Sequence, residues 1–180
     1  MTKVAPPLTE RQAARIKRLG LLADEPAGLL DAWSDIDVRW SDAVAQAMSL
    51  PSDRLETRVN SEWSFIETLR HLIFVTDAWI RDVVLEKRSQ YDPIGLAPHF
   101  ITDRPELDPD ARPSLTSVLV ARHRRLVEVR DVIAETTLDG LDRCCAAFDG
   151  QFTVLGAFQN VIFEEWAHQY YATKDLASLR

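Results

Sequence analysis

Apolar residues recur every three or four positions along the long segments of this chain, and this periodicity constrains the fold more than any other feature. Such spacing is typical of amphipathic helices, because it gathers apolar side chains on one face of a 3.6-residue turn. The chain has only six Gly and nine Pro, and the prolines concentrate between the periodic segments. The sequence therefore predicts an all-α protein whose four substantial helices form a bundle.

Capping signals set the limits of these helices. Asp24 is the expected N-cap of the first long helix, with Pro26 in its first turn. Ser64 and Glu67 form a capping box, and Ser114 caps the next helix. The predicted helices span about residues 9–22, 24–50, 64–86, 114–137 and 153–176. We expect residues 1–23 to form an N-terminal extension with a short helix, and residues 24–180 to form the bundle.

A long proline-rich segment, residues 86–113, separates the second and third long helices. This length is unusual for a helical hairpin, and it is ample to travel back along a helix of about 35 Å. The two helices it joins are therefore predicted to run parallel, connected by this crossover. The same segment could cover whatever the bundle holds.

Bulk composition excludes several classes of protein. A chain of 180 residues with 46% hydrophobic and 27% charged residues is ordinary for one soluble domain. The net charge of −7 argues against a nucleic-acid binder, and no apolar run approaches the ~20 residues that span a bilayer. Because the first residues lack the apolar core of a signal peptide, we expect a cytoplasmic protein. Apolar surface on the first two long helices makes a homodimer plausible.

The cysteines, Cys144 and Cys145, are adjacent. Neighbouring cysteines bridge only through a strained ring, so we expect no structural disulfide. Their spacing also does not match a zinc knuckle. We interpret both as inert or incidental.

Polar residues on apolar helix faces supply the candidate site. Glu164 and His168 lie one turn apart on the last helix, followed on the same face by Tyr171 and Asp175, whereas His71 stands among apolar neighbours. Two imidazoles and one carboxylate from His71, Glu164 and His168 would form a set used by open zinc and non-haem iron sites. Two other interpretations stay open: a core histidine satisfied by one hydrogen bond, or a buried polar network without metal.

The other candidates are weaker. Glu67 also precedes His71 by four residues, but we assign it to the capping box rather than to orienting the imidazole. A di-iron site needs two Glu-x-x-His motifs, and only Glu165 to His168 has that spacing. His99 in the crossover and His123 on a polar flank are not assigned to the site. The five tryptophans are interpreted as core or interface residues.

Two segments, "EWSFIETLRHLIFVTDAW" and "FEEWAHQYYATKDL", resemble the DinB-like superfamily, which includes YfiT-like hydrolases and mycothiol-dependent maleylpyruvate isomerases. The resemblance covers about residues 25–176. It implies a four-helix bundle of up-down-down-up topology and a metal held by three side chains, which fall here on His71, Glu164 and His168. Glutamate in the middle position resembles the isomerase branch, although those isomerases usually carry a further carboxy-terminal domain.

The resemblance also implies a function. The leading hypothesis is a metal-dependent transferase or isomerase that acts on a low-molecular-weight thiol or its conjugate. Its cofactors would be one divalent ion, zinc ahead of nickel, iron or manganese, and mycothiol or a similar thiol. Arg70 or Arg81 could hold a carboxylate of that thiol. The alternative is a metal-binding or stress-related bundle protein without turnover.

Overall fold

A computed structural model describes residues 23–88, 90–147 and 150–179 of the chain. This part is mostly helical, as predicted, while the expected helix at residues 9–22 lies outside it. The four long helices are α2 (Pro26–Met48), α3 (Phe65–Thr76), α4 (Leu115–Glu135) and α6 (Val154–Ser178). The shorter elements are the 3₁₀ helix η1 (Ser52–Glu56), the π-helix η2 (Asp77–Val84), α5 (Leu138–Leu141), β1 (Cys144–Ala147) and β2 (Gly150–Thr153).

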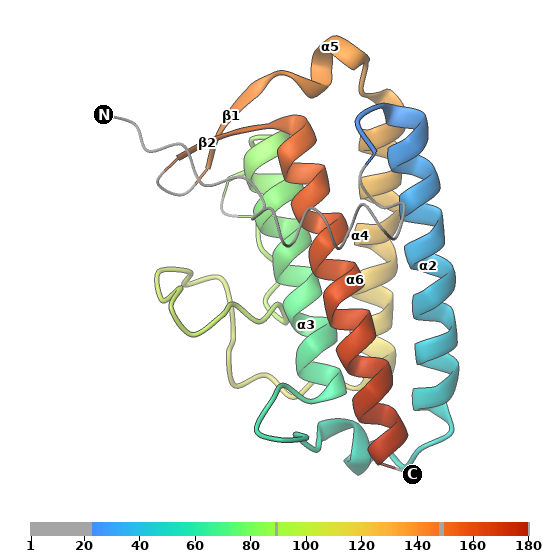
Figure 1. The fold of residues 1–180 in the computed structure, drawn as a ribbon. Coiled ribbons are helices and arrows are strands. Elements are labelled where there is room, and N and C mark those ends of the chain that lie inside the picture. Colours follow the sequence, from blue (N-terminus) through green and yellow to red (C-terminus); the bar gives the residue numbers. More distant parts are fainter. Residues whose placement is uncertain (1–22, 89, 148–149, 180) are drawn as a thin grey trace.

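The long helices lie side by side, with η2 continuing α3 (Figure 1). Helix α3 packs on α4 and α6, and α2 packs on the same two neighbours. Their apolar faces meet in one core that contains Trp33, Leu69 and Phe158. The Trp33 indole donates a hydrogen bond of 3.1 Å to the Leu126 carbonyl, which ties α2 to α4. In Figure 1, α3 and α4 run in the same direction, and the crossover that connects them returns on the side of α3 away from α4.

Helix caps follow the sequence signals closely. The Ser64 hydroxyl accepts from the Glu67 amide at 3.2 Å, and the Glu67 carboxylate accepts from the Ser64 amide at 2.9 Å. This capping box confirms the role assigned to Glu67. Ser114 caps α4 as predicted. At α2 the N-cap is Glu25 rather than Asp24, and no side chain caps the helix there.

The structure departs from the prediction on both sides of α4. The expected helix at residues 64–86 divides into α3 and η2, where a wider ladder includes the Leu85 amide donating to the Ile80 carbonyl. Helix α4 ends at Glu135, and α5 leads into an antiparallel hairpin of β1 and β2. Periodicity could not reveal strands of four residues. Within β1, Cys144 is exposed and Cys145 buried, and both are free, as expected.

None of the helices in the described part of the chain is both long enough and apolar enough to cross a membrane.

Candidate metal centre

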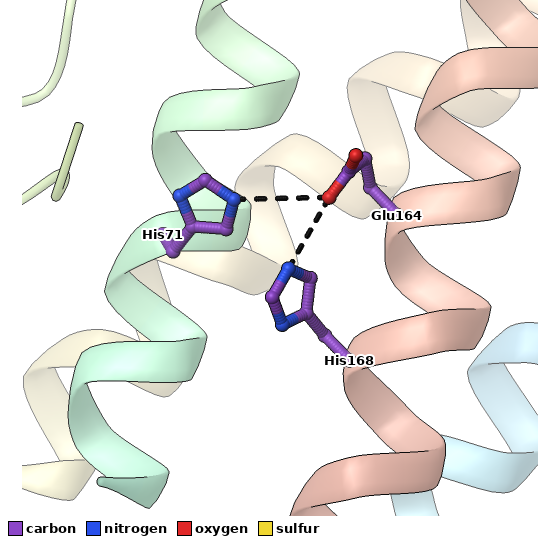
Figure 2. A group of neighbouring side chains, drawn as sticks. All are labelled: His71, Glu164 and His168. Atoms are coloured by element: carbon purple, nitrogen blue, oxygen red, sulfur yellow. Dashed lines mark ion pairs between the residues drawn. The ribbon is translucent and has the colours of Figure 1, made fainter. Parts of the chain in front are cut away.

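Helices α3 and α6 bring the three predicted site residues together. His71 projects from α3, and Glu164 and His168 project from α6 toward it (Figure 2). A carboxylate oxygen of Glu164 lies 3.2 Å from His168 Nε2 and 3.8 Å from His71 Nε2. One donor atom from each residue falls within 4.8 Å of the others. Residues almost a hundred positions apart therefore form one cluster.

The spacing of these donor atoms suits a single small cation. A tetrahedral zinc ion with bonds of about 2.0–2.2 Å keeps its ligand atoms about 3.3–3.6 Å apart. The two separations from the Glu164 oxygen, 3.2 and 3.8 Å, bracket that distance. Two imidazole nitrogens and one carboxylate oxygen are ligands that divalent first-row metals accept. The residues present thus fit such an ion, with positions left for water or substrate.

The crossover orients His71. Its Nδ1 lies 3.1 Å from the Leu96 carbonyl, which can only accept a hydrogen bond. Nδ1 therefore carries a proton, and in the neutral form of the ring Nε2 presents a lone pair toward Glu164 and His168. A backbone partner of this kind is common behind metal-binding histidines. Glu67, bound to Arg58 and Ser64, does not take this part.

Arg70 fastens the crossover to α3. This residue is only 2% exposed. Its guanidinium donates to the carbonyls of Ile94, Asp108 and Ala111 at 2.7–2.8 Å. The Leu96 amide in turn donates to the Arg70 carbonyl. Arg70 is thus a buried clamp, and the suggestion that it holds a substrate carboxylate is wrong.

The electrostatics of the cluster favour an ionised Glu164. Burial alone would raise the pKa of this carboxyl, but hydrogen bonds and positive charge from His168 and His71 in their protonated forms outweigh burial and lower the pKa to about 2. Its side chain is 33% exposed, so it can be reached from outside. An ionised, accessible carboxylate is the form that binds a cation.

Trp63 packs against both histidines, a contact that the sequence analysis did not identify. Its ring centroid lies 4.4 Å from that of His71 and 6.0 Å from that of His168. Asn60 and Ser61 precede it with φ of 52° and 63°, values uncommon outside glycine. Such strain is frequent at functional sites. The only hint in the sequence was an aromatic residue directly before the Ser64 cap.

A cavity of about 710 Å³ opens beside the three residues. His71, Glu164 and His168 form its polar part. Most of the remaining wall is apolar, and its aromatic members are Trp63, Phe74, Trp79, Phe100 and Phe152. This volume is typical of small-molecule sites. The centre can therefore meet an organic molecule.

The π-helix η2 forms part of the cavity wall through Ala78 and Trp79. Its first residue, Asp77, is fully buried and accepts hydrogen bonds from Arg125 on α4 and from the Asp92 amide in the crossover. Arg81 bonds to Gln90 and pairs with Asp77 and Glu128, and it does not line the cavity. π-Helices are rare overall but frequent at functional sites, so we associate η2 with the cavity that it lines.

A second space, of about 400 Å³, which we call the polar groove, shares Trp63 and His168 with the apolar cavity. Its wall is more polar and includes Glu62, Tyr171 and Asp175. Burial raises the pKa of Asp175, and the nearby charge of Glu62 adds to that shift. Tyr171 and Asp175, predicted on the His168 face, therefore border this polar groove and not the apolar cavity.

The other candidates lie apart from the cluster. His99 and His123 are exposed, and neither belongs to the metal-type cluster found among the described residues. Glu165 is buried and forms a two-pronged ion pair with Arg122 at 2.9–3.0 Å. Sequence analysis missed this pair, because Arg122 stands in the polar stretch "ARHRRL".

Comparison with known proteins gives the class to which this helical fold and its metal-type cluster belong. The family model of the DinB superfamily matches residues 27–172. The chain belongs to the DinB superfamily. No curated protein and no solved structure matches it significantly.

Proposed function

We propose that His71, Glu164 and His168 bind one divalent metal ion, zinc first, and that the protein is an enzyme acting on a low-molecular-weight thiol or its conjugate. The observation that carries this proposal is the position of the donor set in the wall of an otherwise apolar cavity of about 710 Å³. A purely structural metal site is normally closed by four protein ligands. Here three donors face a space that can hold a reactant.

The chain's own residues prepare this chemistry. Bound zinc lowers the pKa of a thiol or water that it binds. Leu96 holds the His71 ring with Nε2 toward the centre, and Glu164 supplies negative charge. Trp63 covers one side of both histidines, and the aromatic wall limits the water around them. Electrostatic interactions are stronger in such surroundings.

The two hollows suggest a division between two reactants. We propose that the polar groove takes the hydrophilic body of the thiol, mycothiol or a similar compound, while the apolar cavity takes the other partner. Trp63 and His168 border both spaces, so the sulfur could reach the centre from the groove. The reaction would be of the thiol transferase or isomerase type, which is the theme of the family that the sequence resembles.

We also propose that the four long helices form the up-down-down-up bundle of that family. The parallel course of α3 and α4 in Figure 1 supports this topology. It would explain the long crossover, whose Leu96 carbonyl reaches His71.

Elemental analysis of protein purified without a histidine tag tests the metal site. We expect about one equivalent of metal per chain, lost in His168→Ala and retained in His123→Ala, which changes an exposed histidine on α4. Wild-type protein that holds no metal after dialysis against zinc would contradict the proposal. Turnover of electrophiles with and without a thiol then separates an enzyme from a metal-binding protein without activity.

A further inference from the structure

The wall of the apolar cavity is dominated by aromatic rings from separate parts of the chain. Trp63 precedes α3, Phe74 lies on α3, Trp79 on η2, Phe100 in the crossover and Phe152 on β2. Trp79 and Phe152 meet edge to face, with centroids 4.6 Å apart. Rings presented from several directions offer faces and edges to a flat guest molecule, an arrangement in which aromatic pairs are favourable.

The described part of this wall carries no lysine or arginine. Among the described residues that line the cavity, only His71, Glu164 and His168 are ionisable, and none is a lysine or arginine. Arg70 and Arg81 are engaged elsewhere. An anionic group entering the aromatic end would lose its hydration without gaining a counter-ion. The cavity therefore disfavours anionic reactants away from the centre.

Phe100 marks the outer edge of the cavity. It is 73% exposed, although it borders the same space as Pro98 and Ile101. A ring in this position can pack on a ligand without first leaving the protein core. It is also a position where substitution should not disturb folding.

We infer that the cavity binds an uncharged aromatic compound. The role of this compound as the reaction partner of the thiol rests on the proposed function. The aromatic wall, the lack of lysine and arginine among its described residues and the volume of about 710 Å³ together define this class. Anionic molecules of the maleylpyruvate type, with several carboxylates, do not belong to it.

Calorimetric titration of metal-free full-length protein with three probes tests the inference. The probes are 2-naphthalenemethanol, 2-naphthoate and 1-decanol, which compare a neutral aromatic, its anionic counterpart and an aliphatic alcohol. We expect one molecule of 2-naphthalenemethanol per chain, bound at least about tenfold more tightly than either other probe. Equal or tighter binding of 2-naphthoate or 1-decanol, or no binding of 2-naphthalenemethanol, would overturn the inference.

Variants at Phe100 test whether 2-naphthalenemethanol binds in this cavity. Phe100→Ala should weaken 2-naphthalenemethanol about threefold to tenfold, while Met48→Ala, which changes an equally exposed residue at the end of α2, should leave it unchanged. Phe100→Arg should bind 2-naphthoate more tightly than wild type, and Val38→Arg on the exposed face of α2 should not. Identical behaviour of each variant and its control would mean that the probe binds elsewhere.

Metal content measured on the same preparations distinguishes the proposed metal site from the inferred aromatic ligand. Protein that takes up one zinc ion but ignores 2-naphthalenemethanol would refute the aromatic ligand and leave the metal site intact. Protein that binds the probe at Phe100 but no metal would refute the proposed function and leave the ligand class standing.

Discussion

Glu164 and Glu165 are neighbours on α6, yet their surroundings differ completely. Glu165 is 1% exposed and both its oxygens accept from the Arg122 guanidinium. Glu164 is 33% exposed, faces two histidines and borders the cavity. A guanidinium stays protonated and keeps its partner carboxylate paired, whereas an imidazole can release its proton and leave the carboxylate able to bind a cation. The charge partner thus separates a structural carboxylate from a candidate ligand.

The largest effect should come from breaking the buried pair. Arg122→Ala or Glu165→Ala should lower the free energy of unfolding by about 3–5 kcal/mol, because each leaves an unpaired charge in the core. Urea unfolding measures this. Asp131→Ala, which removes a surface partner of Arg130, should cost less than about 0.5 kcal/mol. If the Glu165→Ala cost were as small, the pair would not be the internal support described here.

Glu164→Gln should show the opposite pattern. We expect at least about a hundredfold weaker zinc binding, since one charged donor is lost, with a change of about 1 kcal/mol or less in the stability of metal-free protein. Zinc competition with a chelating dye and urea unfolding measure the two quantities. Full zinc affinity in this variant would remove Glu164 from the ligand set.

Arg70 should act at a distance from the centre. Arg70→Gln should weaken zinc binding about tenfold to a hundredfold, the usual effect of disturbing the support of a ligand, because the crossover that carries the Leu96 carbonyl loses its clamp. Arg112→Gln, at an exposed arginine of the same segment, serves as the control. Equal zinc affinity in Arg70→Gln and wild type would show that His71 is oriented without the clamp.

The smallest effect concerns pH. The folded-state pKa of Glu164, about 2, lies below its ordinary value of 4.5. The resulting stabilisation is therefore present above pH 4.5 and is lost as pH falls toward 2. After allowance for solvent screening, we expect about 1 kcal/mol. Unfolding of metal-free wild type and Glu164→Gln at pH 5 and pH 3 should show their difference shrinking, and a constant difference would exclude this contribution.

Local sequence signals predicted the helical framework of the molecule well. The capping box at Ser64 and Glu67 and the cap at Ser114 depend on hydrogen bonds between residues that are close in sequence. Both are present in the structure. The cluster of His71, Glu164 and His168 was predictable because two of its members lie one turn apart on a helix. Their meeting with His71 required α3 and α6 to face one another, which the resemblance to a family supplied.

Other features depend on contacts that no local pattern encodes. Arg122 and Glu165 look like surface residues until both are buried together. Tyr170 on α6 is exposed, although it lies one turn after the buried Trp166. Trp63 lies outside the helices, so the helical periodicity of the sequence could not predict where its side chain packs. The second helix divides at Asp77, whose carboxylate bonds to Arg125 and to the Asp92 amide, and no local pattern predicts these contacts.

The partner of His71 is a main-chain oxygen, and this has a consequence for the changes that the crossover can tolerate. Any amino acid at position 96 offers the same carbonyl, so the side chain there is free to change. What must be preserved is the count of residues between the anchor points at Ile94 and Asp108. Substitutions at position 96 would therefore leave the hydrogen bond in place, while a single insertion beside Leu96 would misalign the imidazole.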